Sequence, residues 1–368
     1  MSDTSSVFQQ SLRKSALVSQ MACTETHNLT TWKEFILMGI IGPPELQAPL
    51  LGLSLTFYFV SVVGNLSLII LTKIASRLQT PMYFLLRHLA LTDLGYSTAV
   101  GPKMLANFAV DQPTISYTWC ATQLTFFSIF ITSEIFILSA MAYDRYVAIC
   151  NPLLYTVIMS HRLCQLLVAI PYLYSILLSL LTIIKIFLSS FGGYNVIRHF
   201  YCDSLPLIDL LCSDTHEIRL IILIFSAFNL VSSLLIVLVS YMLILVAVLR
   251  MNSAEGRHKA FSTCGSHLTV IVIFYGSLFF MYVQPKPSHS FDTDKIASLF
   301  YTLVIPMLNP MIYSLRNKEV KYSRRSSFRE NIIQAPVIDA NTQEPHLYAG
   351  TRGYQNRYNQ SGIVNKIK

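Results

Sequence analysis

Charged residues are scarce in this sequence. Asp, Glu, Lys and Arg make up 12% of the 368 residues, whereas 53% are hydrophobic; an average soluble domain is about 25% charged. The length would allow two soluble domains, but the apolar residues come in blocks that are too long and too free of charge for a soluble core. The composition therefore excludes an ordinary water-soluble protein and favours one membrane domain.

Three further absences narrow the function. Residues 1–20 are polar, contain Arg13 and Lys14 and lack an apolar core, so we expect no cleavable signal peptide and assign insertion to the first span. His, Cys and carboxylate residues do not cluster with the spacing of a metal or nucleophile site, so we expect no enzyme and no organic cofactor. The motifs are not duplicated between the two halves, which argues against most transporters.

Long apolar runs are the strongest signal that is present. A helix needs about 20 apolar residues to cross the hydrocarbon. Five runs qualify directly: 50–72, 163–184, 220–249, 260–285 and 296–315. Two more, 82–102 and 120–143, carry internal charges, with Asp93 in the first and Glu134 in the second. The sequence therefore predicts an all-α membrane protein with a bundle of seven transmembrane helices.

The distribution of Lys and Arg sets the predicted orientation. Bases follow spans one, three, five and seven, whereas acidic residues precede spans five and seven on the opposite side. Lys and Arg favour cytoplasmic loops, so we expect an extracellular N-terminus and a cytoplasmic C-terminus at the plasma membrane. The net charge of +8 then suits a surface facing anionic lipid, and we expect membrane lipid rather than nucleic acid as a partner.

This topology divides the chain into three parts. Residues 1–49 form the expected extracellular segment, 50–322 the membrane domain and 323–368 a polar, flexible cytoplasmic tail. Asn28 begins an Asn-Leu-Thr acceptor for glycosylation on the predicted outer side. Cys120 opens span three on that side and Cys202 lies in the loop before span five, so we predict a disulfide between them. Cys212 has no obvious partner.

Two acids inside the spans call for a compensating group. Buried charges in a membrane are costly, so Asp93 and Glu134 should face each other inside the bundle. One interpretation is a cation site, with sodium as the candidate ion and with Asn65 and Asn309 as further oxygen donors. The other is a hydrogen-bonded pair of protonated carboxyls. The residues leave both interpretations open.

Two motifs lie near the predicted cytoplasmic ends of spans three and seven. Asp144-Arg145-Tyr146 places an acid beside an arginine whose five donors, once released, could bind carbonyls of a partner. Asn309-Pro310 interrupts span seven, because Pro310 removes a backbone hydrogen bond. This proline is either a hinge or a purely structural feature.

Together these segments resemble the olfactory receptors, a rhodopsin-like family of G-protein-coupled receptors, over about 28–321. The matching segments are Gly64-Asn65, Pro81 to Phe84, Leu89 to Asp93, Met141 to Cys150, Ser240-Tyr241, Lys259 to Cys264 and Pro306 to Tyr313. The resemblance implies a short amphipathic helix after span seven. It assigns the G-protein switch to Asp144, Arg145, Tyr146, Tyr241, Tyr275, Asn309, Pro310 and Tyr313.

The sequence also departs from the family at three places. Family members usually carry a loop cysteine where Gly192 stands, paired with the cysteine at the position of Cys212. The resemblance therefore implies that Cys212 is a free thiol here. The segments before Met21 and after Tyr322 also look foreign to the family.

A ligand site is expected in the outer half of the bundle. Helical steps from Cys120 reach Leu124, Phe127, Ser128, Ile131 and Thr132. The resemblance adds Phe225, Asn229, Leu278, Phe279, Tyr282, Tyr301 and Thr302, each of which could also be a packing residue. Amine receptors of this superfamily carry an Asp at the position of Phe127, and opsins carry a Lys at the position of Leu303. Because both residues are missing here, a cationic amine and retinal are disfavoured, and a small neutral volatile is the better candidate.

The sequence thus predicts an odorant-activated receptor that acts through a stimulatory, olfactory-type G protein and cyclic AMP. The alternative is a cation-conducting transporter or channel that uses Asp93 and Glu134 as its ion path.

Overall fold

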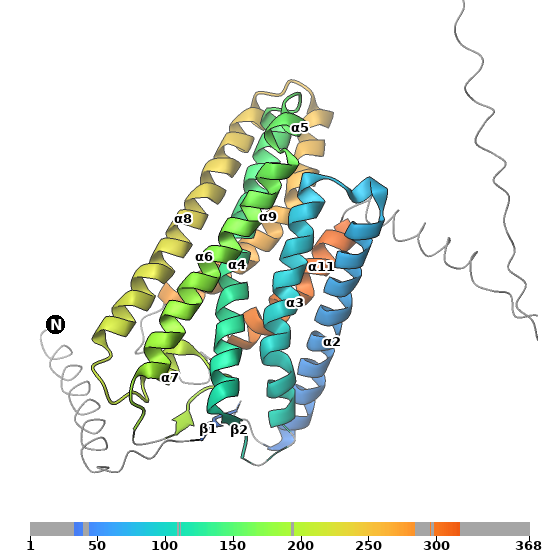
Figure 1. The fold of residues 1–368 in the computed structure, drawn as a ribbon. Helices are drawn as coiled ribbons and strands as arrows, with labels where there is room; N and C mark the ends of the chain where they lie inside the picture. Colours follow the sequence, from blue (N-terminus) through green and yellow to red (C-terminus); the bar gives the residue numbers. More distant parts are fainter. Residues whose placement is uncertain are drawn as a thin grey trace, which may run out of the picture. The chain divides into compact units, whose positions relative to one another are not determined.

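The chain folds into a bundle of long helices with a small sheet at one end (Figure 1). The computed structural model describes residues 33–39, 44–108, 110, 112–192, 195–283, 295 and 298–316. The long elements are α2 (Pro44–Ile74), α3 (Pro81–Asn107), α4 (Tyr117–Cys150), α6 (His161–Leu188), α8 (His216–Leu249), α9 (Ala254–Val283) and α11 (Ile305–Arg316), which the π-helix η3 (Phe300–Val304) precedes.

These helices correspond to the seven predicted spans, with η3 and α11 together forming the seventh. Four of them, α2, α4, α6 and α8, are long and apolar enough to cross a membrane by length and composition alone. The helix α3 has the required length but holds Arg87, His88 and Asp93. The predicted bundle of seven helices is confirmed by this arrangement together with the fold comparison reported below.

Residues that favour the start of a helix stand at the beginnings of α3, α4 and α6. Ser116 caps α4 by accepting a hydrogen bond from the Trp119 amide at 3.3 Å, and Ser160 caps α6 in the same way from Leu163 at 3.4 Å. Pro81 occupies the first turn of α3, where its missing N–H costs no hydrogen bond. Shorter elements lie in the connections: η1 (Ser76–Leu78), α5 (Tyr155–Ile158) and α7 (Ser204–Ile208).

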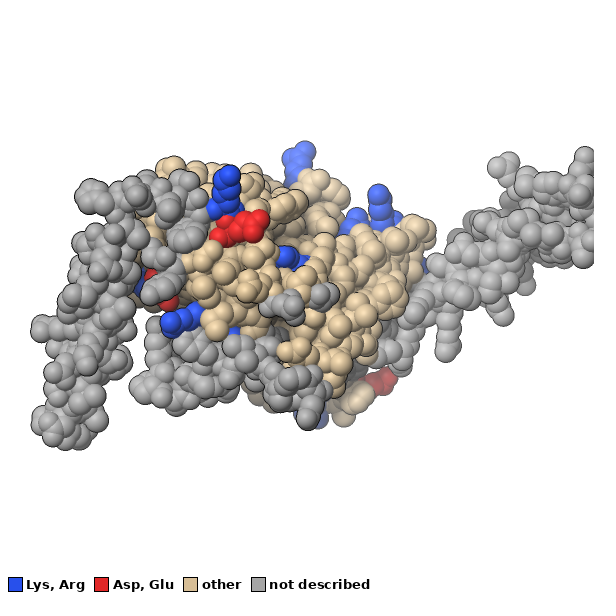
Figure 2. Space-filling view, turned by 90° about the horizontal axis from the view of Figure 1, so that it is seen from below, with Lys and Arg blue, Asp and Glu red and all other residues tan. Residues whose placement is uncertain are grey.

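A three-stranded sheet closes the end of the bundle opposite α5, and the sequence pattern did not predict it. The strand β1 (Glu34–Leu37) pairs antiparallel with β2 (Thr114–Ser116) and parallel with β3 (Val196–Ile197). Residues from three distant parts of the chain therefore meet here. We call this end of the molecule, with the sheet and the loop 189–215, the sheet end. Viewed from it, most of the described surface is uncharged, and the charged side chains are scattered (Figure 2).

Two large groups of buried hydrophobic residues hold the fold together, beside a small third group formed by Ile244, Val248 and Cys264. The larger one runs through the bundle and includes Leu85, Leu138 and Phe274. The smaller one lies under the sheet end and includes Phe35, Ile115 and Leu207. The sheet end thus has its own core, which ties the loop before α8 to α4 and α6.

Gly64 allows the first and last spans to approach closely. A Cβ atom at this position would come within 2.9 Å of Cγ of Pro310, which is closer than side chains pack in protein interiors. The absence of a side chain brings the Asn65 turn of α2 against the Asn309-Pro310 turn of α11. This contact places the central polar groups.

Three sequence expectations lie outside the described residues: glycosylation at Asn28, the amphipathic helix after span seven and the tail 323–368.

Candidate functional site

The polar residues of the spans meet in the middle of the bundle. Nδ2 of Asn309 donates to both carboxylate oxygens of Asp93, at 3.0 and 2.9 Å. The Tyr96 hydroxyl donates to Oδ1 of Asp93 at 3.2 Å. Asn65 joins the seventh span, because its Nδ2 donates to the Pro306 carbonyl at 2.9 Å. Asn309 thus presents its amide nitrogen to Asp93, whereas the predicted cation site uses its oxygen.

Glu134 lies beside this network but is not satisfied by it. Its side chain is fully buried and interacts with Asp93 and Tyr96. Neither of its carboxyl oxygens has a hydrogen bond of regular geometry, and the same holds for Oδ1 of Asn65. Buried polar atoms are normally paired, so these three oxygens leave room for a proton or a cation. Among the described residues, no three His, Cys, Asp or Glu side chains gather as a metal site.

At the end of α4 near α5, the Arg145 guanidinium is paired with the neighbouring Asp144. Its Nε and Nη2 atoms donate to Oδ2 of Asp144 at 3.1 and 2.7 Å. The Tyr155 hydroxyl donates to the other oxygen, Oδ1, at 2.8 Å. Asp144 is fully buried, and its two partners satisfy both of its oxygens. The restraint by Asp144 follows from the motif, whereas the contribution of Tyr155 was not predicted.

The other expected switch residues are tyrosines of α4, α8, α9 and α11. The Tyr241 hydroxyl is hydrogen-bonded to Nδ1 of His267 at 2.9 Å, linking α8 to α9. Tyr275 and Tyr313 are buried, and neither hydroxyl has a hydrogen-bond partner of regular geometry. Tyr146 is half-buried and contacts Tyr143 with 6.2 Å between ring centroids. Because neither hydroxyl has a hydrogen bond of regular geometry, a second arrangement of α9 and α11 could pair them better.

The loop before α8 is fastened over the bundle. Cys120 and Cys202 form a disulfide, as predicted. Gln123 adds a second fastening, because its Oε1 accepts from the Cys202 amide at 2.9 Å and its Nε2 donates to the Ala99 carbonyl at 2.9 Å. One buried amide therefore ties the loop to α3 as well as α4.

The expectation for Cys212 was wrong. Cys212 is disulfide-bonded, although Gly192 stands where the family's partner cysteine is expected. The backbone at this point is still paired, since the Gly192 amide donates to Leu210 at 3.2 Å and the Cys212 amide to Ser190 at 2.9 Å. The partner of Cys212 lies outside the described residues, which is why spacing within the loop could not reveal it.

Aromatic side chains gather beneath this loop. Phe127 contacts Tyr201 at 5.3 Å, Tyr301 at 6.2 Å and Tyr96 at 6.3 Å between ring centroids. The hydroxyls of Tyr201 and Tyr301 are hydrogen-bonded to each other. We call these four residues the aromatic cluster. It joins the predicted ligand residues Phe127 and Tyr301 to the Asp93 network through Tyr96; neither Tyr96 nor Tyr201 was predicted.

The loop contributes one further polar contact to the seventh span. Nε2 of His199 is hydrogen-bonded to Oγ of Ser298 at 3.1 Å. Burial, together with the nearby charge of Lys295, lowers the pKa of His199 to about 3. His199 is therefore neutral at neutral pH, so the contact is a hydrogen bond without an ionic component.

The remaining predicted ligand residues divide into three groups. Asn229 is buried, and its Oδ1 accepts from the Tyr174 hydroxyl at 2.7 Å, so it is engaged with α6. Thr302 is buried and its hydroxyl donates to Ser298 of its own helix at 2.7 Å. Half-buried positions are Ser128, Ile131, Thr132 and Phe225. The side chains of Leu278, Phe279 and Tyr282 lie outside the described residues.

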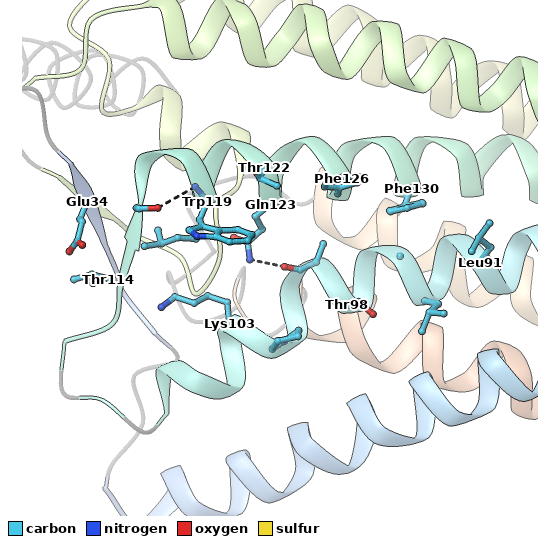
Figure 3. Close-up of a pocket in the computed structure, with 16 residues that line it drawn as sticks. Glu34, Leu91, Thr98, Lys103, Thr114, Trp119, Thr122, Gln123, Phe126 and Phe130 are labelled. Atoms are coloured by element: carbon cyan, nitrogen blue, oxygen red, sulfur yellow. Dashed lines mark hydrogen bonds between the residues drawn. The ribbon is translucent and has the colours of Figure 1, made fainter.

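A separate cavity of about 890 Å³ lies between α3 and α4. Figure 3 shows it from the side, with Glu34, Lys103 and Trp119 near the sheet end and Phe126, Phe130 and Leu91 farther along the helices. None of the predicted ligand residues lines it. The cavity therefore belongs to another face of α4 than the aromatic cluster.

Known proteins have sequences similar to this chain. The family model described as "Olfactory receptor" matches residues 54–330. Human olfactory receptor 8K3 is 73% identical over 304 residues, which cover 83% of this chain and 97% of that protein. Human olfactory receptor 8K5 is 68% identical over 295 residues, covering 80% and 96%. Mouse olfactory receptor 8U3 is 57% identical over 294 residues, covering 80% and 92%.

The fold has a counterpart among solved structures. The crystal structure of squid rhodopsin matches with a TM-score of 0.59 at 18% identity, covering 80% of this chain and 91% of that one. At this identity the match establishes the fold alone, a bundle of seven transmembrane helices. The family match over most of the chain establishes the rest: this protein belongs to the olfactory receptor family of rhodopsin-like G-protein-coupled receptors.

Proposed function

We propose that this receptor is activated by a small, neutral, volatile odorant that binds at the aromatic cluster. The observation that carries the proposal is the continuous path from Phe127 and Tyr301 through Tyr96 to Asp93 and Asn309. A ligand that fits between these rings gains apolar contact, and the tyrosine hydroxyls can supply one or two hydrogen bonds. A cationic ligand has less support, because Phe127 stands where an acid would be needed.

The signal would travel along the seventh span. Tyr301 lies in the π-helix η3, and Asn309 lies two turns farther along in α11. An odorant that separates Tyr301 from Tyr201 can change how η3 is wound, and so shift Asn309 against Asp93. π-Helical segments are rare and often mark functional sites. A ligand shifts such an equilibrium only by binding the two arrangements with different affinity.

The output would be release of Arg145 from Asp144, which frees its guanidinium for a partner protein. We propose that this partner is a heterotrimeric stimulatory G protein of the olfactory type and that cyclic AMP rises as a result. We place the sheet end outside the cell and the Arg145 end in the cytoplasm of a plasma-membrane receptor, in agreement with the Lys and Arg distribution. Membrane lipid surrounds the bundle.

We also propose that Asp93 and Glu134 hold a sodium ion in the resting receptor. The residues fit such a group, because both oxygens of Glu134 and Oδ1 of Asn65 are buried without hydrogen-bond partners of regular geometry. Oxygen ligands of this kind suit a hard cation. The ion would supply positive charge that neither acid finds among its protein neighbours.

An odorant panel read by cyclic AMP tests the proposal. Cells that express the receptor should respond to a subset of small neutral volatiles, and cells that express Arg145→Ala at the same surface density should not. Voltage clamp on the same cells should show no receptor-dependent current. A cation current without a cyclic AMP response would favour the channel alternative instead.

A further inference from the structure

The cavity between α3 and α4 has a polar end and an apolar end. Near the sheet, β1 contributes Glu34, α3 contributes Lys103 and α4 contributes Trp119. Farther along, the lining is formed by Leu91, Leu94, Gly95, Phe126 and Phe130. Its volume of about 890 Å³ falls within the roughly 300–1,000 Å³ of ordinary small-molecule sites. A ligand of this cavity must therefore be amphiphilic.

The charges at the polar end select the headgroup. Lys103 attracts a phosphate, whereas Glu34 would repel a headgroup that carries only negative charge. Trp119 is 69% exposed, so its ring offers a face to a cation, and aromatic faces bind quaternary ammonium groups. A headgroup with a phosphate and a quaternary ammonium satisfies all three side chains.

The apolar end is shaped by Gly95. A Cβ atom there would lie 2.5 Å from the ring of Phe130, so the absence of a side chain lets this ring lie against the α3 backbone. Phe126 and Leu91 beside it are 50% and 42% exposed. The groove therefore presents a continuous apolar surface to one hydrocarbon chain.

We infer that this cavity binds a phosphocholine lipid of the outer leaflet, with the phosphate at Lys103, the choline at Trp119 and Glu34, and an acyl chain along Phe126 and Phe130. The inference rests on the orientation given under the proposed function, which places the sheet end at the outer surface. It does not depend on the odorant or on the G protein.

Native mass spectrometry of the full-length receptor in dodecyl maltoside tests it without agonist or G protein. Dioleoylphosphatidylcholine is titrated in parallel with dioleoylphosphatidylglycerol, which has the same chains and phosphate but no choline. We expect preferential retention of the phosphatidylcholine. Lys103→Gln and Trp119→Leu should each weaken that retention about three- to tenfold, as the loss of one partly desolvated contact would.

Matched controls separate the groove from general effects. Lys73→Gln removes a base at the other end of the bundle. Phe228→Leu removes an aromatic ring from the surface of α8, where the Phe228 side chain is 57% exposed. Both should retain the lipid like the unmutated receptor, and thermal unfolding checks that all four variants are folded. Equal or stronger retention of phosphatidylglycerol, no retained lipid, or equal losses in the Lys103 and Lys73 variants would each overturn the inference.

Discussion

The hydrogen bond from Tyr155 to Asp144 should restrain the receptor in its resting arrangement. In Tyr155→Phe, Oδ1 of the buried Asp144 loses its donor, while Arg145 still occupies Oδ2. A hydrogen bond to a charged group contributes about 1.5–3 kcal/mol. Tyr155 is only half-buried, so water can replace part of this hydrogen bond in the mutant. We therefore expect the resting arrangement to lose about 1 kcal/mol of stabilisation, which is roughly a fivefold shift toward released Arg145.

Cyclic AMP in cells without odorant, normalised to receptor at the surface, measures this shift. Tyr155→Phe should raise the basal signal about threefold to fivefold, less if the resting equilibrium is already near its midpoint. Tyr143→Phe is the matched control, because it removes a tyrosine hydroxyl from the same end of α4 without touching Asp144. An unchanged or lower basal signal in Tyr155→Phe would show that this bond does not hold the resting state.

The remaining predictions concern the loop and the buried acids. Non-reducing peptide mapping should recover Cys212 joined to Cys23, the one cysteine outside the described residues. In Cys212→Ser the thiol of the former partner should become accessible to an impermeant maleimide. Labelling of Cys212 itself in the unmutated receptor would contradict this. Because the pKa of His199 is lowered to about 3 from an ordinary 6.5, the unfolded chain binds more protons below pH 6.5, so stability should fall as the pH drops from 6.5 toward 3. His199→Gln should flatten that part of a melting-temperature profile, and an equal slope would refute the assignment. The free energy of unfolding should fall by similar amounts in Asp93→Asn, in Glu134→Gln and in their double mutant, and each variant should lose the stabilisation by sodium at constant ionic strength. Additive decreases, or no effect of sodium on the unmutated receptor, would instead indicate a protonated pair.

Sequence reasoning succeeded where the signal is local. The spans could be predicted because an apolar run of sufficient length is seldom found outside a membrane helix. Cys120 and Cys202 could be paired because topology places both on one side. That Asp93 and Glu134 lie together in the bundle follows from two costly acids that must both avoid the lipid.

Long-range packing was the part that could not be predicted. Tyr201 reaches Tyr301 because the loop folds back over α4, and loop residues carry no periodicity that would indicate this. The strand β1 needs partners from two distant loops, so four residues of sequence gave no signal for it. The groove beside Gly95 depends on how Phe130 packs across α3, and the missing side chain at that position is informative only once the two helices are placed.

The most direct test of the account is a concentration–response curve for one active odorant, recorded by cyclic AMP in three receptors expressed at equal surface density. Phe127→Leu should shift the half-maximal concentration to higher odorant without lowering the maximum, because it removes contact at the aromatic cluster alone. Arg145→Ala should abolish the response, because the guanidinium is needed for the partner protein. A full response from Arg145→Ala, or an unshifted curve from Phe127→Leu, would contradict the proposed path from the aromatic cluster to Arg145.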